Sequence, residues 1–138
     1  MTANLETRAL QFIMAIACLV PIVAGAVGMW RGTSWLDDTG ADLDSHFRYL
    51  SGLLMGLGLA FAMCIPRVET NTVIVRLLTL IVIAGGIGRA IGFAHAIPSV
   101  GMRWALVMEL GVTPLLCLWQ SRIASRSVAL SEAEMTQP

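Results

Sequence analysis

Residues 73–97 read VIVRLLTLIVIAGGIGRAIGFAHAI, an apolar run whose ionisable side chains are Arg76, Arg89 and His95. A helix needs about 17 to 25 predominantly apolar residues to cross the hydrocarbon layer of a bilayer. This run is long enough to do so, and it is too long for a strand. The pattern therefore predicts a transmembrane helix over residues 73–97.

The rest of the chain contains three more long apolar runs. Together with the first run they predict helices over about residues 9–29, 47–65, 73–97 and 103–121. The predicted fold class is all-α, an integral membrane four-helix bundle formed by residues 1–124. Residues 125–138 are polar and lack aromatic side chains, so we expect a cytoplasmic tail that is helical at first and then frayed.

The composition excludes several classes of protein. Hydrophobic residues make up 57% of the chain and charged residues 13%, which does not suit a soluble globule of this size. The nine basic residues, all arginine, are balanced by nine acidic residues, so no basic field attracts nucleic acid. No P-loop, dinucleotide-binding, zinc-protease or serine-hydrolase motif occurs. Cys18, Cys64 and Cys117 show no ligand spacing and are expected to pack as small hydrophobes.

The arginines predict the orientation of the chain in the membrane. Cytoplasmic loops carry an excess of arginine and lysine. One side of the predicted bundle carries Arg8, Arg67, Arg76, Arg122 and Arg126, and the other carries Arg31 and Arg103. We therefore expect a multi-pass protein of the bacterial inner membrane with both termini cytoplasmic. The first loop, which contains Asp37, Asp38, Asp42 and Asp44, then faces outward, alongside Trp35 as an interfacial aromatic residue.

Small residues predict where the helices pack, because close approach replaces the hydrophobic effect as the source of helix contact in lipid. The expected contact faces carry Gly52 and Gly56 in the second helix and Gly85, Gly88 and Gly92 in the third. The same spacing suits a dimer interface equally well. Pro114 is expected to kink the fourth helix and to free the backbone carbonyl of Leu110, which follows Glu109.

Ionisable residues at similar depth predict a charged cluster in the outer third of the bundle. Glu109 lies inside the fourth helix, Arg89 lies inside the third, and Arg48 opens the second. An intramembrane charge is costly unless it is paired or solvated, so we expect Glu109 to pair with Arg89 in a buried ion pair. This pair is either a structural staple or part of a working site. Two arginines against one glutamate would leave positive charge for an anionic ligand.

His46 and His95 complete the predicted ligand-binding set with Arg48, Arg89 and Glu109. They lie at the outer ends of the second and third helices, where a histidine is usually solvated. Two histidines without a third ligand do not define a metal site. We therefore expect no metal and no cofactor.

Three strings carry a resemblance to a known family: HFRYLSGLLMGLGL at 46–59, GGIGRAIGF at 85–93 and IPSVGMRWALVMELGVTPLL at 97–116. Together they resemble an uncharacterised family of small bacterial four-helix membrane proteins, known as a domain of unknown function. The resemblance spans most of the chain. It implies the four-helix fold, matches Arg48, Arg89 and Glu109 to the family's distinctive positions, and implies no activity.

Three functions remain open at this point. The first is a binding or accessory module that holds a lipid or apolar ligand by its polar end, or docks on a larger membrane complex or a second copy. The second is an intramembrane isomerase that uses Glu109 as its acid and base. The third is a small proton-coupled transporter with Glu109 as the exchange carboxylate.

Overall fold

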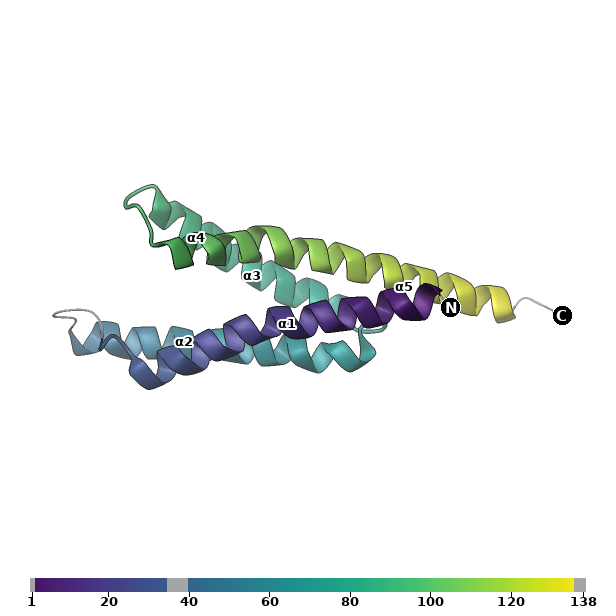
Figure 1. Cartoon of the computed structure of the whole chain (residues 1–138), viewed down its shortest axis with the longest axis horizontal. Helices are drawn as coiled ribbons and strands as arrows, with labels where there is room; N and C mark the ends of the chain where they lie inside the picture. The colour runs from purple at the N-terminus through teal and green to yellow at the C-terminus, as the bar shows by residue number, and fades with distance from the viewer. Residues whose placement is uncertain (1, 35–39, 136–138) are drawn as a thin grey trace. The chain divides into compact units, whose positions relative to one another are not determined.

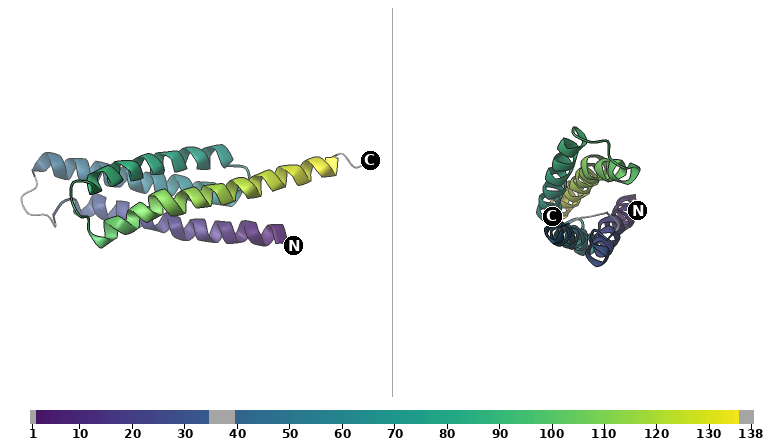
Figure 2. Two further views of the ribbon diagram at one scale, coloured as in Figure 1. Left: turned by 90° about the horizontal axis from the view of Figure 1, so that it is seen from above. Right: turned by 90° about the vertical axis from the view of Figure 1, so that its left-hand side faces the viewer.

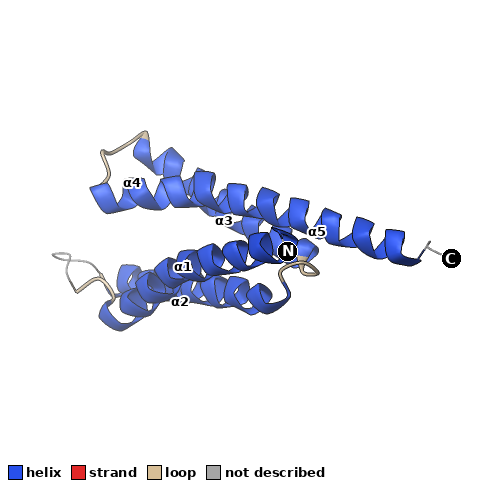
Figure 3. Cartoon of the chain, turned by 45° about the vertical axis from the view of Figure 1, so that its right-hand side comes forward, coloured by secondary structure: helices blue, strands red, loops and turns tan. Residues whose placement is uncertain are grey.

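The computed structural model describes residues 2–34 and 40–135, and every regular element within them is a helix (Figure 3). The elements are α1 (Thr2–Arg31), α2 (Ala41–Cys64), a short 3-10 helix (Ile65–Arg67), α3 (Thr72–Phe93), α4 (Val100–Val107), a π-helical turn (Met108–Val112) and α5 (Thr113–Met135). Trp35, Asp37 and Asp38 of the predicted outer loop lie outside the described residues.

Four of the helical segments are long and apolar enough to cross a membrane. In the described part of the chain they cover Asn4–Arg31, Ala41–Arg67, Thr72–Phe93 and Val100–Ala129. The last segment joins α4, the π-helical turn and α5 into one continuous helix (Figure 2). At most 22% of the residues in the apolar window of each segment are buried. Such exposed apolar faces suit contact with lipid, and the prediction of an all-α protein with four membrane-length helices is confirmed.

The helix boundaries differ from the expected ones at several ends. The second helix begins at Ala41 instead of residue 47, because Asp42 and Asp44 form an acidic first turn that is favourable at a helix N-terminus. The third ends at Phe93 instead of residue 97. The fourth continues to Met135, so the predicted fraying is absent up to that residue.

The chain divides into two compact units, of which the first, the α1–α2 unit, comprises Gln11–Pro66. Its two helices are antiparallel and lie side by side (Figure 1). The side-chain amide of Gln11 donates to the carbonyl of Ile65 at 2.9 Å. At mid-helix, a Cβ on Gly58 would lie 2.8 Å from the side chain of Ile22. The absence of a side chain at this glycine allows the two helices to approach closely.

The second unit, the α3–α5 unit, comprises Met1–Leu10 and Arg67–Pro138. In it α3 runs antiparallel to the helix formed by α4, the π-helical turn and α5 (Figure 1). Gln120 is fully buried, and its amide nitrogen donates to the carbonyl of Val68 at 2.6 Å and to Thr72 Oγ1 at 2.9 Å. These bonds tie the segment before α3 to α5.

The first turns of α1 also belong to the α3–α5 unit. Glu6 pairs with Arg126 at 2.8 Å, and the hydroxyl of Thr7 donates to Glu69 at 2.7 Å. The beginning of α1 and the second half of α5 therefore lie at the same end of this unit.

Most of the predicted contact glycines make no close contact within their own unit, and a dimer interface at these glycines stays a prediction. A Cβ at Gly56, Gly85, Gly88 or Gly92 would meet no atom within 4 Å, and one at Gly52 would make only ordinary contact with the Met29 side chain. The close approaches occur instead at Gly25, Gly28, Gly58 and Gly86. Spacing shows that glycines share a face of a helix, but it does not show toward which neighbour that face turns.

Candidate functional site

The predicted pairing of Arg89 with Glu109 is present in the α3–α5 unit. Arg89 Nε donates to Glu109 Oε2 at 2.9 Å, and Arg89 Nη2 donates to Glu109 Oε1 at 2.8 Å. This is the two-pronged geometry in which a guanidinium and a carboxylate bind most strongly. Arg89 lies four residues before the end of α3 at Phe93, about 6 Å along the helix axis. It is therefore nearer to the helix end than the sequence predicted.

The π-helical turn carries Glu109. Met108–Val112 form this turn, and both the backbone N–H and the hydroxyl of Thr113 donate to the carbonyl of Met108. Pro114 follows directly and has no N–H to continue the α-helical ladder. The expected disturbance at Pro114 is thus present as a widened turn. Such turns are rare and are found frequently at functional sites.

Gly86 allows the carboxylate to reach α3. A Cβ at this position would lie 2.7 Å from Leu110 Cδ2 and 3.1 Å from Glu109 Cβ. The backbone of α3 therefore passes directly against the π-helical turn. Gly85, its neighbour in the sequence, faces away from this contact. Gly86 is the close-contact glycine that the spacing argument missed.

The ion pair is partly exposed, with 30% of the Arg89 side chain and 18% of the Glu109 side chain accessible. The prediction of a buried ion pair is not confirmed, because two helices cover only part of a side chain as long as arginine. The third guanidinium nitrogen, Nη1, lies 2.9 Å from the sulfur of Met102. A thioether is a weak acceptor, so this nitrogen is the part of the pair that a stronger acceptor would bind.

Arg48 belongs to the α1–α2 unit and has a carboxylate of its own. Its Nε donates to Asp44 Oδ2 at 2.7 Å, and its Nη1 donates to the carbonyls of Met29 and Trp30 at 2.6 and 3.0 Å. Arg48 thus satisfies the last carbonyls of α1, which have no partner within the helix. The expected surplus of positive charge is absent, because each of the two arginines binds its own carboxylate.

Asp44 completes a set of polar contacts at the end of α1. We call this set, formed by Asp44, Arg48, Thr33 and the carbonyls of Met29 and Trp30, the polar staple. Its Oδ1 accepts from the backbone N–H of Thr33 at 2.6 Å and from the Thr33 hydroxyl at 3.0 Å. Gly32 adopts a left-handed conformation with φ 58°, which turns the chain out of α1 toward these groups. A side chain at Gly32 would also collide with Asp44 and Arg48.

The two histidines are exposed and belong to different units, His46 to the α1–α2 unit and His95 to the α3–α5 unit. The ring of His46 lies 6.5 Å from that of Tyr49. Among residues 2–34 and 40–135, no three His, Cys, Asp or Glu side chains are placed to hold a metal ion.

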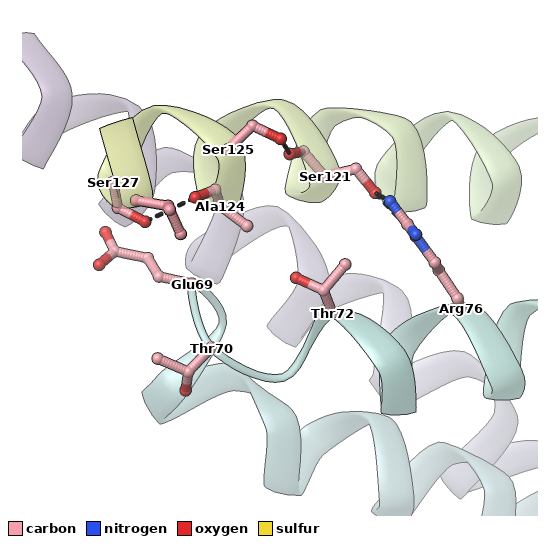
Figure 4. Close-up of a pocket in the computed structure, with 9 residues that line it drawn as sticks. Glu69, Thr70, Thr72, Arg76, Ser121, Ala124, Ser125 and Ser127 are labelled. Carbon is pink, nitrogen blue, oxygen red and sulfur yellow. Dashed lines mark hydrogen bonds between the residues drawn. The ribbon is translucent and has the colours of Figure 1, made fainter. Parts of the chain in front are cut away.

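A second polar site lies at the opposite end of the α3–α5 unit, where α3 begins. It is an open hollow of about 500 Å³ (Figure 4). Its hydroxyl side chains are Thr70, Thr72, Ser121, Ser125 and Ser127. Arg76 and Glu69 add one charge of each sign, and Arg76 extends from α3 toward Ser121 on α5. No pattern in the sequence predicted this hollow.

Two signals in the sequence could have led to the contacts that were missed. Asp44 stands four residues before Arg48, the spacing at which opposite charges meet on a helix. Gln120 is the glutamine inside the fourth apolar run, and a polar side chain there needs a partner on a neighbouring helix. The hollow has no comparable signal, since its residues come from separate segments.

The fold defines a small α-helical protein whose four long helices have the length and apolar character of membrane spans. An ion pair between Arg89 and Glu109 lies at its π-helical turn. The chain belongs to a family known as a domain of unknown function, DUF4345, whose model matches residues 9–120. The resemblance found in the sequence is therefore confirmed. No curated protein and no solved structure matches the chain.

Proposed function

We propose that the four long helices cross the bacterial inner membrane as one bundle, with both termini in the cytoplasm. The arginines at the ends of the helices support this orientation, because they gather on the side of the two termini. The contact between Glu6 and Arg126 supports an even number of crossings, since it brings the start of α1 and the second half of α5 to one end of the α3–α5 unit.

Within this membrane protein we propose a binding site for the polar end of a lipid or another apolar ligand at Arg89 and Glu109. The observation that carries the proposal is the contact between Arg89 Nη1 and the sulfur of Met102. A phosphate, carboxylate or carbonyl oxygen is a far better acceptor than a thioether. A ligand that displaces Met102 would therefore gain a charge-assisted hydrogen bond while Glu109 keeps the guanidinium in position.

The partial exposure of the pair supports access from the bilayer. A ligand with an apolar body would lie along the partly exposed apolar side chains at this site, Met102 beside Arg89 and Leu110 beside Gly86, which are 43% and 38% exposed. Its polar end would then meet Nη1 of Arg89 without leaving the membrane. Docking on a larger membrane complex or a second copy would use the same exposed pair.

The acid–base alternatives have less support from the geometry. Both oxygens of Glu109 accept hydrogen bonds from Arg89. An isomerase or a proton-coupled transporter needs one of these oxygens to give and take a proton, so the pair would first have to separate. The binding module requires no such separation.

Native mass spectrometry of the detergent-purified protein tests the binding proposal. We expect the wild-type chain to retain an apolar ligand, and Arg89→Gln to lose at least about tenfold in occupancy because a charge-assisted hydrogen bond is removed. Arg103→Gln, which removes an exposed arginine from α4, serves as the matched control. Met102→Leu removes the competing sulfur and should keep or increase occupancy.

Two results would contradict the proposal. One is an occupancy in Arg89→Gln equal to that of the wild type. The other is an equal loss in Arg89→Gln and Arg103→Gln, which would show a general effect of charge. Infrared spectra that show Glu109 taking up a proton during turnover of an added substrate would favour the enzyme instead.

A further inference from the structure

Arg76 forms no ion pair with any of the described residues. Within residues 2–34 and 40–135, its partner is the hydroxyl of Ser121, at 3.4 Å from Nε and 3.3 Å from Nη2. Arg89, Arg48 and Arg126 each have a carboxylate within 2.8 Å. A guanidinium that meets only a neutral hydroxyl at long range retains donors for an anion.

Two hydroxyls beside Arg76 also have protons to donate. Ser121 Oγ accepts from Arg76, and Thr72 Oγ1 accepts from the amide of Gln120. Neither hydroxyl donates to an acceptor among the described residues. By contrast, the hydroxyls of Ser125 and Ser127 already donate to backbone carbonyls (Figure 4). Arg76, Thr72 and Ser121 therefore present several donors to one hollow, a set that suits the oxygens of a phosphate.

Gln120 fixes the position of Thr72, one of the three donor residues. Its amide nitrogen fixes Thr72 Oγ1 at 2.9 Å, and its side chain is fully buried. The acceptor Oε1 of the same amide has no partner among the described residues. The Gln120 amide cannot be reversed without placing Oε1 against the carbonyl of Val68, so its orientation is determined by the bond at 2.6 Å.

An amphipathic groove of about 720 Å³ adjoins the polar hollow along α5. Its apolar side chains are Leu115, Leu118 and Trp119, and it shares Ser121 and Ser125 with the hollow. Arg122 and Arg126 also line the groove, and Arg126 is paired with Glu6. Polar and apolar surfaces thus follow one another along the helix, as phosphate and acyl chain do in a phospholipid.

The position along the chain agrees with this occupant. Thr72 is the first residue of the membrane-length segment Thr72–Phe93, and Arg76 lies one turn further in. The ends of such segments lie at the level of the lipid headgroups, and the next turns lie at the level of the acyl chains. With the membrane crossing proposed above, on which this step rests, the hollow lies at the level of the lipid phosphates and the groove extends toward the hydrocarbon.

We infer that this hollow binds the phosphate of an anionic membrane phospholipid, with Arg76, Ser121 and Thr72 as donors and with an acyl chain along Leu115, Leu118 and Trp119. The site is separate from the Arg89–Glu109 pair, which lies at the other end of the same helix pair. It does not depend on the function proposed for that pair.

Native mass spectrometry with added lipids tests the inference on the full chain in detergent. Phosphatidylglycerol provides the phosphate and the acyl chains, diacylglycerol provides the chains alone, and glycerol 3-phosphate provides the phosphate alone. We expect phosphatidylglycerol to bind the wild type at least about tenfold more tightly than either of the other two. Arg76→Gln should weaken phosphatidylglycerol binding by about tenfold.

Ser121→Ala provides a second variant with little effect on folding, and it should weaken binding of phosphatidylglycerol by a few-fold. Arg8→Gln is the matched control, because Arg8 is an exposed arginine of α1 that does not line the hollow or the groove. Its binding of phosphatidylglycerol should equal that of the wild type.

Three outcomes would overturn the inference. Equal weakening by Arg76→Gln and Arg8→Gln would show attraction by net charge alone. Equal binding of diacylglycerol would show that the phosphate is not recognised. Equal binding of glycerol 3-phosphate would show that the occupant is a soluble phosphate ester and that the groove holds no acyl chain. None of these outcomes bears on ligand binding at Arg89, so the two proposals fail separately.

Discussion

The guanidinium of Arg89 and the carboxylate of Glu109, twenty residues apart in sequence, form two parallel hydrogen bonds between α3 and the π-helical turn. Glu6 and Arg126 form a single bond at 2.8 Å in the same unit, with 46% and 59% of their side chains exposed. The two pairs have the same chemistry and differ in exposure and geometry. Their energies should therefore differ, because screening weakens an exposed pair.

Double-mutant cycles at the two pairs test this difference. Arg89→Ala and Glu109→Ala should each lower the free energy of unfolding by about 1 to 3 kcal/mol, because either change leaves a partly covered charge without its partner. The double variant should cost less than the sum of the single variants. The control cycle at Glu6 and Arg126 should give a coupling between about 0 and 1 kcal/mol. Equal coupling energies in the two cycles would contradict the argument.

The sequence predicted which charged residues pair within the apolar helices, but it did not predict the side chains around that pair. The pairing of Arg89 with Glu109 follows from similar depth and from the cost of an isolated charge in lipid. The weak third contact to Met102 does not follow, because a methionine side chain has three flexible torsions and no spacing rule. The bond from Arg48 to Asp44 was not predicted, since the depth of Arg48 was considered and its neighbour Asp44 was not.

Among the elements, α1 and α2 bring their backbones into close contact at Gly25. A Cβ on Gly25 would lie 2.6 Å from the backbone nitrogen of Met55 and 2.6 Å from the carbonyl oxygen of Ser51. Backbone atoms cannot move aside as a flexible side chain can. Gly56, in the same unit, faces open space.

Alanine substitutions at these two glycines should change the stability of the protein by different amounts. Gly25→Ala should push α1 away from α2 and lower the free energy of unfolding by about 1 to 3 kcal/mol. Gly56→Ala should change it by less than about 0.5 kcal/mol, because the added methyl group meets nothing and alanine favours the helix. Reversible unfolding in mixed detergent micelles measures both. A greater loss at Gly56 would show that this glycine, and the face predicted from GxxxG spacing, forms the contact.

The existence of each element could be predicted, but its rotation could not. Apolar length alone identifies a membrane-length helix, and all four were found in this way. The rotation of each helix about its own axis determines which face meets the neighbouring helix. A glycine pattern does not define this rotation. The π-helical turn has a partial signal in Pro114, whose missing N–H disturbs the ladder around Glu109. Pro114 would be equally compatible with a kinked α-helix that has no π-helical turn.

For the molecule as a whole, the arginine distribution predicts the side of the membrane on which each end of the chain lies. Single cysteines introduced into a background without Cys18, Cys64 and Cys117 test it with a membrane-impermeant maleimide. Asp42→Cys should react in cells whose inner membrane is intact. Asn4→Cys and Ala129→Cys should react only after that membrane is broken. Labelling of Asn4→Cys or Ala129→Cys in intact cells would reverse or disprove the proposed topology.

The division into two units is the part of the whole molecule that the sequence did not reveal. The apolar runs are similar in length and composition, so nothing in them marks α1 and α2 as one pair. Polar contacts within the units include the bond from Gln11 to Ile65 in the first and the bonds from Gln120 to Val68 and Thr72 in the second. These contacts join residues 48 to 54 positions apart, and local sequence patterns do not extend so far.

The polar staple between the end of α1 and the start of α2 has a consequence for synthesis of the protein. Asp44, Arg48, Thr33 and the carbonyls of Met29 and Trp30 all lie within twenty residues of one another, and the α1–α2 unit ends at Pro66. This hairpin can therefore close while the remaining half of the chain is still on the ribosome. The α3–α5 unit contains the contact from Glu6 to Arg126, so it is complete only after translation has passed α5. We therefore expect the hairpin to assemble first and the α3–α5 unit to be completed last.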